Sequence, residues 1–138
     1  MSDCLLDTNV ISETARQRPA LRVMTWLAAR SRLLVSSVSW FEIRRGIDVL
    51  PRSRRRQALE DWLQRWETSG LEVLAFDREA ATEAARLEVE SRRRGRSIEF
   101  RDLFVLGTAR ASGLVVATRN VSDFDGLGVE IFDPFTNT

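Results

Sequence analysis

The 138-residue sequence contains no histidine, no tyrosine and a single cysteine, Cys4. Without histidine, the chain has no imidazole to act as a general base, to complete a Ser–His or Cys–His arrangement, or to bind zinc. A single cysteine excludes an internal disulfide and a thiolate zinc site, and it fits a reducing cytoplasm. Phosphate-binding loops of the GxxxxGK[ST] and GxGxxG types are also missing. An enzyme built from this chain would therefore use carboxylates, arginines and hydroxyls, together with a hard metal ion.

Long apolar runs and lysine are absent as well. No apolar run approaches the roughly 20 residues needed to cross a bilayer, and the N-terminus lacks the features of a secretory signal. We therefore expect a cytoplasmic protein with no membrane partner. All 21 basic residues are arginine, and with 20 acids the net charge is only +1. The length predicts one domain, residues 1–138, large enough to bury a core.

Short apolar runs alternate along the chain with segments of helical periodicity. Apolar runs predict strands at residues 4–6, 33–36 and 114–118, and more weakly at 71–76 and 129–132. Helical spacing predicts helices at residues 20–30, 38–50, 54–68, 77–94 and 98–111. This alternation indicates an α/β domain with a mainly parallel sheet.

Polar side chains follow three of the predicted strands at the points where those strands end. They are Asp7, Ser36, Ser37, Arg119, Asn120 and Asp123. Ligands of open parallel sheets bind beyond the carboxyl ends of the strands. We therefore expect these groups to lie along one edge of the sheet.

Two more acids occupy helix faces that are otherwise apolar or small, so both are predicted to face inward. Glu42 shares its face with Val38, Gly46 and Val49. Asp102 shares its face with Ile98, Val105, Leu106 and Ala109. A buried carboxylate is costly unless it is paired, hydrogen-bonded or metal-bound. With 21 arginines in the chain, a separate ion pair for each acid is one interpretation.

Clustering is the other interpretation. Asp7, Glu42, Asp102 and Asp123 would repel one another if they met at one edge of the sheet, and a divalent cation removes that conflict. Carboxylates and water are the ligands that suit Mg²⁺ or Mn²⁺.

Four segments together resemble the motifs of the PIN-domain family, and specifically the VapC/FitB-like toxins of bacterial toxin–antitoxin pairs. They are LLDTNVISE, VSSVSWFEIRRG, RDLFVLGTA and TRNVSDF, and they extend over nearly the whole chain. The resemblance implies a three-layer α/β/α sandwich and an activity similar to that of metal-dependent endoribonucleases. It implies Asp7, Glu42 and Asp102 as the core metal ligands.

The fourth motif leaves two candidates for the last ligand. Asn120 offers a carbonyl oxygen without charge, so Asp123 is the preferred fourth acid. The third motif departs from the family pattern, because Arg101, Leu103 and Phe104 surround Asp102 where relatives usually have small residues. The departure is expected to affect substrate fit or the dimer contact.

The resemblance also implies partners and a reaction. It implies an RNA substrate, a homodimer and a cognate antitoxin that blocks the site, with promoter DNA bound only through the antitoxin. Metal-dependent attack by water on a phosphodiester would leave a 5′-phosphate and a 3′-hydroxyl. The route through the ribose 2′-hydroxyl loses its usual acid and base in a chain without histidine.

Several neighbouring polar residues have two interpretations each. Thr8 and Asn9 either cap a helix that starts after Asp7 or support that carboxylate and bind phosphate. Strand-end hydroxyls of Ser36 and Thr118 either hold a ligand or hold the backbone. Glu99 is a weaker fifth acid, because surface acids are common at helix starts.

Outside the predicted site, arginines and tryptophans raise separate questions. Arg54, Arg55 and Arg56 follow a likely cap, Ser53, and cations are unfavourable at a helix start. That cluster is either an RNA or acidic-partner contact or a solvated patch. Trp62 and Trp66 extend an apolar stripe and are interpreted as packing residues, whereas Trp40 either lines the site or fills the core.

Two other functions remain open at this point. One is a binding module with the same fold and a weak metal site, acting through its antitoxin complex. The other is phosphate transfer through an aspartyl nucleophile at Asp7. Such sites commonly place a second Asp two residues later, where this chain has Asn9, so that option ranks last.

Overall fold

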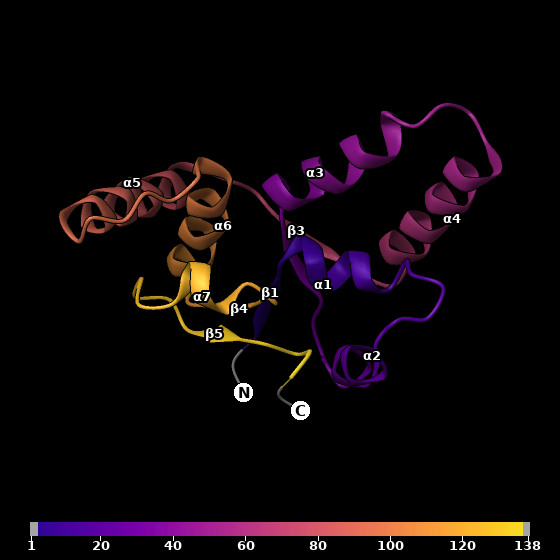
Figure 1. The fold of residues 1–138 in the computed structure, drawn as a ribbon, viewed down its shortest axis with the longest axis horizontal. Coiled ribbons are helices and arrows are strands. Elements are labelled where there is room, and N and C mark those ends of the chain that lie inside the picture. Colours follow the sequence, from indigo (N-terminus) through magenta and orange to yellow (C-terminus); the bar gives the residue numbers. More distant parts are fainter. Residues whose placement is uncertain (1–2, 137–138) are drawn as a thin grey trace.

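The computed structural model describes residues 3–136, and its strands form one sheet in which every pairing is parallel. The strands are β1 (Cys4–Leu6), β2 (Leu34–Ser36), β3 (Glu72–Leu74), β4 (Val115–Ala117) and β5 (Ile131–Phe132). They lie in the order β3-β2-β1-β4-β5 (Figure 1). All five predicted strands are present, and the predicted parallel sheet is confirmed.

Helices fill the connections between the strands. They are α1 (Thr8–Glu13), α2 (Leu21–Ala28), α3 (Ser37–Asp48), α4 (Arg54–Thr68), α5 (Arg78–Arg93), α6 (Phe100–Ala111) and α7 (Val121–Phe124). The five predicted helices end within two residues of the observed bounds. Helix α7 was not predicted, because four residues are too few to show a helical period. Among residues 3–136, no helix combines the length and apolar character needed to cross a membrane.

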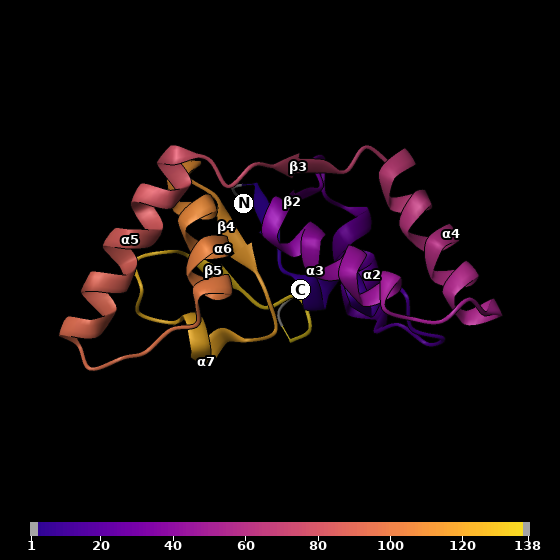
Figure 2. The same ribbon diagram turned by 90° about the horizontal axis from the view of Figure 1, so that it is seen from above.

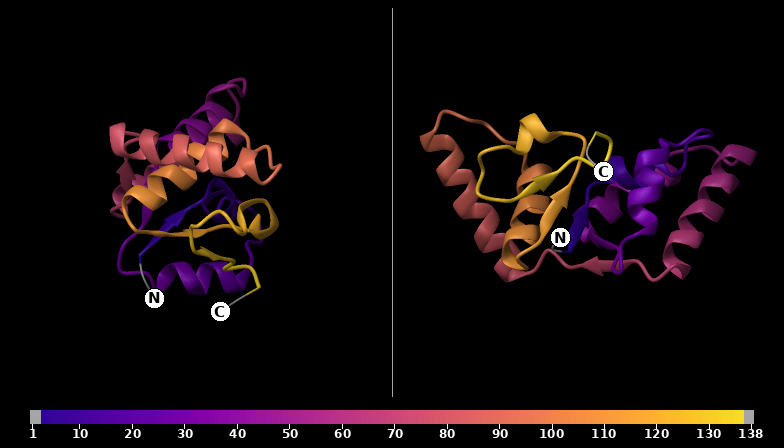
Figure 3. Two further views of the ribbon diagram at one scale, coloured as in Figure 1. Left: turned by 90° about the vertical axis from the view of Figure 1, so that its left-hand side faces the viewer. Right: turned by 90° about the horizontal axis from the view of Figure 1, so that it is seen from below.

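Neighbouring residues of each strand face opposite helical layers. In β1, Cys4 and Leu6 pack with helices α1 to α4, whereas Leu5 packs with α5 and α6. In β4, Val115 joins the first core and Val116 the second. Both faces of the sheet are therefore covered, which is why these strands read as continuous apolar runs. Figure 3 shows the resulting three layers, which confirm the predicted α/β/α sandwich.

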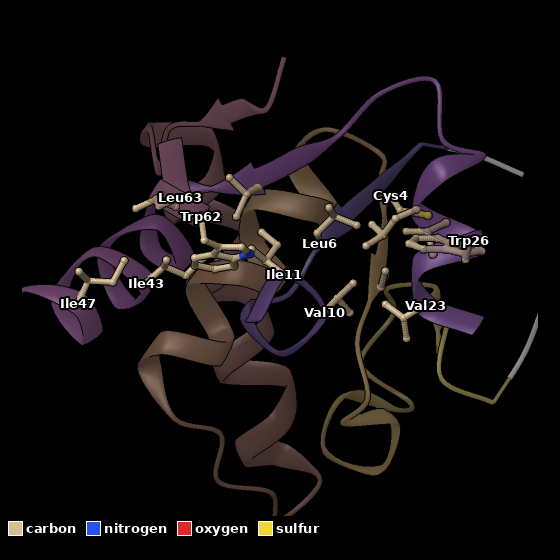
Figure 4. Packing of buried hydrophobic residues seen from close by; sticks show 14 residues of the cluster. Cys4, Leu6, Val10, Ile11, Val23, Trp26, Ile43, Ile47, Trp62 and Leu63 are labelled. Carbon is tan, nitrogen blue, oxygen red and sulfur yellow. The ribbon is translucent and has the colours of Figure 1, made fainter. Parts of the chain in front are cut away.

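The first core contains the tryptophans of α4 and shows what they do. Trp62 is buried and lies near Ile11 in Figure 4. The indole N–H groups of Trp62 and Trp66 both donate to Oγ1 of Thr14, each over 2.9 Å. Trp40 packs against the same core. The interpretation of Trp62 and Trp66 as packing residues is confirmed, and the half-buried Trp40 packs against the edge of this core.

The order of the strands places a ligand-binding position at the centre of the sheet. From β1 the chain builds outward through β2 and β3, then returns to place β4 on the other side of β1. The direction of winding therefore changes between β1 and β4, and ligands of open α/β sheets bind at such points, beyond the carboxyl ends of the strands. Leu6 pairs with Ala117, so Asp7 and Thr118 leave the sheet side by side. Figure 2 shows α4 and α5 at opposite ends of the molecule, on either side of this central region.

Candidate metal centre

Asp7 is held at the end of β1 by bonds to both of its carboxylate oxygens. Its side chain is buried, and its backbone N–H donates to Ala117 O over 2.9 Å, which extends the sheet. Oδ1 accepts from the N–H of Thr8 over 2.8 Å, so Asp7 itself caps α1. The interpretation of Thr8 or Asn9 as the cap is therefore wrong. Oδ2 accepts from Thr118 Oγ1 over 2.7 Å and from Asn9 Nδ2 over 3.3 Å.

Thr8, Asn9 and Thr118 connect the candidate ligands to one another. Thr118 is fully buried, and its hydroxyl oxygen also accepts from Asn9 Nδ2 over 3.1 Å and from the N–H of Asn120 over 3.0 Å. Thr8 Oγ1 donates to Oε1 of Glu42 over 3.2 Å. These polar groups link the ends of β1 and β4 to the acid on α3. Each of them orients a neighbouring group of the site.

Glu42 reaches the same region from α3, although its helix face differs from the prediction. Its side chain is 19% exposed, and Gly46 and Val49, which were expected beside it in the interior, are exposed. Burial instead follows Ile43 and Ile47, one residue further round the helix. The larger aliphatic side chains determine which face packs, so Glu42 lies at the boundary between the core and the surface.

Ser36 belongs to the start of α3. It is fully buried, and its Oγ accepts from the N–H of Ser39 over 3.0 Å while donating to Ser39 Oγ over 3.2 Å. The side chain therefore caps α3. Of its two interpretations, the structure favours holding the backbone.

Asp102 lies in the first turn of α6 among other charges. Burial raises the pKa of this carboxyl to about 6. The positive charge of Arg101 opposes that rise, while the negative charges of Asp7, Glu99 and Asp123 add to it. Asp102 is therefore close enough to Asp7 and Asp123 for their charges to act on it, as the clustering interpretation expects for these three acids.

Asp123 and Asn120 border a cavity of about 490 Å³ that Asp102 also lines. Asp123 is exposed on α7, and Asn120 is the residue immediately before that helix. Glu99 lines the same cavity and is 77% exposed. The structure thus brings both candidates for the fourth ligand to the space beside Asp102. Only Asp123 of the two brings a negative charge.

Arg101 occupies a position that sequence reasoning did not assign. Its Nη1 lies 2.5 Å from Oε2 of Glu42, and its Nη2 lies 3.8 Å from Oδ1 of Asp102 and 3.8 Å from Oε2 of Glu99. In residues 3–136, no three acid or cysteine side chains stand close enough together to hold one metal ion. The guanidinium lies among the carboxylates instead. The signal available in the sequence was the unusual arginine next to the acidic position of RDLFVLGTA.

The chemistry of the donor set fits a hard divalent cation. Every strong donor at this edge is a carboxylate or an amide or hydroxyl oxygen, which are the ligands of Mg²⁺ and Mn²⁺. Burial is the main cause of the raised pKa of Asp102, and a bound cation would favour the charged form of this carboxyl.

Two features lie outside this site. Glu13 is a buried acid at the end of α1, where the N–H of Ala20 and the side chain of Arg16 lower its pKa. It ties α1 to the following loop. Arg54, Arg55 and Arg56 begin α4 at the end of the α3–α4 hairpin away from the sheet (Figure 1). Ser53 caps this helix as predicted, and contact of these arginines with RNA or a partner stays a prediction.

Comparison with known proteins extends over almost the whole chain. The PIN domain family model matches residues 4–128. A VapC ribonuclease, Y4jK, of Sinorhizobium fredii is 33% identical over 135 residues, covering 95% of this chain and 96% of that protein. Toxin FitB of Neisseria gonorrhoeae is 32% identical over 138 residues, covering 95% and 97%.

Solved structures agree with these sequence matches. The crystal structure of FitAcB from Neisseria gonorrhoeae superposes with a TM-score of 0.89 and 30% identity, over 97% of this chain and 99% of that chain. A DNA-bound VapBC structure from Salmonella typhimurium superposes with a TM-score of 0.79 and 30% identity, over the same shares of both chains.

Proposed function

The chain belongs to the PIN domain family, and on that premise we propose that it is a metal-dependent endoribonuclease, the toxin of a cytoplasmic toxin–antitoxin pair. One observation supports the proposal most. Asp7 follows the strand end at which the winding of the sheet changes direction, and the negative charges of Asp7 and Asp123 add to the raised pKa of Asp102. The names of its relatives, a VapC ribonuclease and a FitB toxin, support the same function.

In this proposal, Asp7, Glu42, Asp102 and Asp123 hold one or two Mg²⁺ or Mn²⁺ ions. A bound divalent cation lowers the pKa of water and offsets negative charge on phosphate oxygens. Hydrolysis of the RNA phosphodiester by such a water would leave a 5′-phosphate and a 3′-hydroxyl.

The chain's own residues prepare the ligands for that chemistry. Thr118 and Asn9 fix the Oδ2 oxygen of Asp7, and Thr8 fixes the Oε1 oxygen of Glu42. Residues that orient a ligating carboxylate in this way typically change metal affinity by 10- to 100-fold when they are replaced. Because the carboxylate of Asp7 is already held by its neighbours, it needs little rearrangement when a metal ion binds.

Partners form part of the same proposal. We expect a homodimer and a cognate antitoxin that blocks the site, with promoter DNA bound only through the antitoxin. The DNA-bound VapBC structure supports DNA binding by a complex of this kind. Large apolar side chains left exposed on three helices, namely Leu21, Phe41 and Phe100, also support protein partners.

The alternative function is a PIN-fold binding module with a weak metal site that acts through its antitoxin complex. The ion pair between Arg101 and Glu42 favours it, because a carboxylate already paired with a guanidinium is less available to a cation. This alternative predicts tight binding of the partner and no RNA cleavage.

The test is cleavage of total RNA by the purified protein with Mn²⁺ or Mg²⁺ and with EDTA. We expect metal-dependent cleavage that is lost in Asp7→Asn and Asp102→Asn. Glu67→Gln is the matched control, because it neutralises an exposed acid of α4 outside the site. Equal cleavage by the wild type and both site variants, or full cleavage in EDTA, would overturn the proposal. Absence of cleavage by the wild type would favour the binding module.

A further inference from the structure

Arg101 joins acids from two helices at the candidate metal centre. It is in the first turn of α6, and its Nη1 atom contacts Oε2 of Glu42 on α3 over 2.5 Å. Its Nη2 atom lies 3.8 Å from Oδ1 of the adjacent Asp102 and 3.8 Å from Oε2 of Glu99. Within residues 3–136, each ion pair of this guanidinium is therefore made with an acid at the candidate site.

The guanidinium of Arg101 also borders two cavities next to the candidate metal centre. Arg101 lines the cavity of about 490 Å³ that Asp102 and Asp123 also border. It also lines a second cavity of about 410 Å³, bordered by Glu42 and Phe41. The guanidinium therefore stands between the two spaces, with Glu42 on one side and Asp102 on the other.

Burial and charge indicate how firmly Arg101 is held. Half of its side chain is exposed, whereas the side chains of Glu42 and Asp102 are 19% and 23% exposed. A half-exposed arginine on a flexible stem can leave at modest cost, because pairs of this kind contribute about 1 kcal/mol or less. Glu42 and Asp102 are more buried than Arg101. When the guanidinium leaves, their negative charges must be compensated by another cation, because an unpaired buried charge is costly.

A guanidinium and a divalent cation compete for the same carboxylate oxygens. Arginine forms directed hydrogen bonds to carboxylates through its planar fork, which occupies the lone pairs that a metal ligand must donate. Oε1 of Glu42 accepts from Thr8 and Oε2 accepts from Arg101. While the guanidinium remains in contact, it occupies one lone pair of Oε2, and its positive charge repels a cation that approaches the same carboxylate.

We propose that Arg101 is a built-in counter-ion of the metal-free site, which holds Glu42 and Asp102 in place and is displaced from them when a divalent cation binds. The inference rests on the proposed metal site and adds a positioning residue to it. Arg101 stabilises the empty site and lowers its affinity for metal. The cation therefore binds with an apparent affinity reduced by the free energy of the arginine pairs.

The first experiment measures Mn²⁺ binding by isothermal titration calorimetry in the absence of RNA. Arg101→Gln is expected to bind Mn²⁺ about fivefold more tightly than the wild type, the factor that corresponds to an ion pair of about 1 kcal/mol. Arg45→Gln is the matched control, because it removes the same charge from an exposed position on α3. Its Mn²⁺ affinity should stay close to that of the wild type.

A second measurement separates competition from a general change in charge. In EDTA, Arg101→Gln should unfold at a lower urea concentration than the wild type, because Glu42 and Asp102 lose their counter-ion. In saturating Mn²⁺ the difference should disappear, because the tighter Mn²⁺ binding of Arg101→Gln offsets the ion pairs that it lost. Arg101→Lys keeps the charge without the planar fork, and its Mn²⁺ affinity should lie between those of the wild type and Arg101→Gln. In the background of Glu42→Gln, the gain from Arg101→Gln should shrink, because the main partner is gone.

The outcomes distinguish this inference from the proposed function. Suppose that the wild type binds Mn²⁺ and cleaves RNA, but Arg101→Gln binds Mn²⁺ no more tightly. That result would overturn the counter-ion role of Arg101 without affecting the proposed ribonuclease function. Equal tightening by Arg45→Gln would also overturn it, because the effect would then be one of net charge. If neither the wild type nor Arg101→Gln binds Mn²⁺, the metal site fails and the inference fails with it.

Discussion

The hydroxyl of Thr118 donates to Oδ2 of Asp7 over 2.7 Å, although 111 positions separate the two residues in the chain. The pairing of Leu6 with Ala117 in the sheet brings them together. Oδ1 of Asp7 already accepts from the N–H of Thr8, so both carboxylate oxygens have fixed partners. The fold therefore sets the orientation of Asp7 before any ligand arrives.

Replacing Thr118 by valine keeps its shape and removes this hydroxyl. The change removes the short bond to Asp7 Oδ2, which keeps only Asn9 Nδ2, and leaves the N–H of Asn120 without its partner, so we expect a loss of about 1–3 kcal/mol in the free energy of unfolding. Mn²⁺ affinity should fall by about tenfold, because the carboxylate is no longer oriented. Urea unfolding in EDTA and calorimetric Mn²⁺ titration measure the two effects. Thr118→Ser retains the hydroxyl and should keep most of the affinity, so an equal loss in both variants would assign the effect to packing.

Local sequence patterns were sufficient to predict much of this arrangement. The apolar runs that end at Leu6 and Ala117 placed Asp7 and Thr118 at strand ends, and parallel strands bring such ends to one edge of a sheet. The face of Glu42 was predicted wrongly, because a rotation of one residue along α3 depends on how Ile43 packs in the core. Such a rotation is set by tertiary contacts.

The ion pair between Arg101 and Glu42 could not be predicted from the sequence, for a different reason. It joins residues 59 positions apart, and the sequence offered 21 arginines as partners for any acid. Which arginine meets Glu42 depends on how α3 and α6 approach each other across the end of the sheet. The residue pattern within each helix does not predict how the two helices pack against each other.

One hydroxyl supports the tryptophans of α4. Thr14 Oγ1 accepts from the indoles of Trp62 and Trp66 and donates to Ile11 O over 2.7 Å. Thr14→Val removes all three bonds and leaves two largely buried N–H groups unpaired, so we expect a loss of about 2–3 kcal/mol in the free energy of unfolding. Thr14→Ser should lose much less. Denaturant unfolding followed by tryptophan fluorescence measures both variants, and similar losses would show that the methyl group matters more than the hydroxyl.

Two helical glycines are predicted to respond oppositely to alanine. A Cβ on Gly107 of α6 would lie 2.5 Å from Ala80 O and 2.8 Å from Ala84 Cβ, so Gly107→Ala must push α5 and α6 apart. We expect it to lower the free energy of unfolding by about 1–3 kcal/mol. A Cβ on Gly46 of α3 would meet nothing within 4 Å, so Gly46→Ala should raise that free energy by about 0.5–1 kcal/mol. Urea unfolding of both variants checks the pair, and a change of the same sign in both would contradict the close approach of α5 and α6.

The raised pKa of Asp102 predicts that this acid destabilises the metal-free protein at neutral pH. Its pKa is about 6 in the folded chain, against an ordinary value of 3.8, mainly because of burial. Between about pH 4 and pH 6 the folded state keeps a proton that the unfolded chain has released, so stability falls as pH rises through that window. Below pH 4 Asp102 is protonated in both states, so the destabilisation is absent.

Asp102→Asn removes this titration while keeping the shape of the side chain. In EDTA at pH 7.5 it should therefore be more stable than the wild type by about 1–3 kcal/mol, and the difference should shrink toward zero at pH 4. Urea unfolding at a series of pH values measures both proteins, with Glu67→Gln as the exposed control. Saturating Mn²⁺ should reverse the order at pH 7.5, because only the wild type keeps the charged ligand that the cation stabilises. A difference that does not vary with pH would mean that Asp102 is not strained by burial, and that its neighbours already neutralise it without a metal.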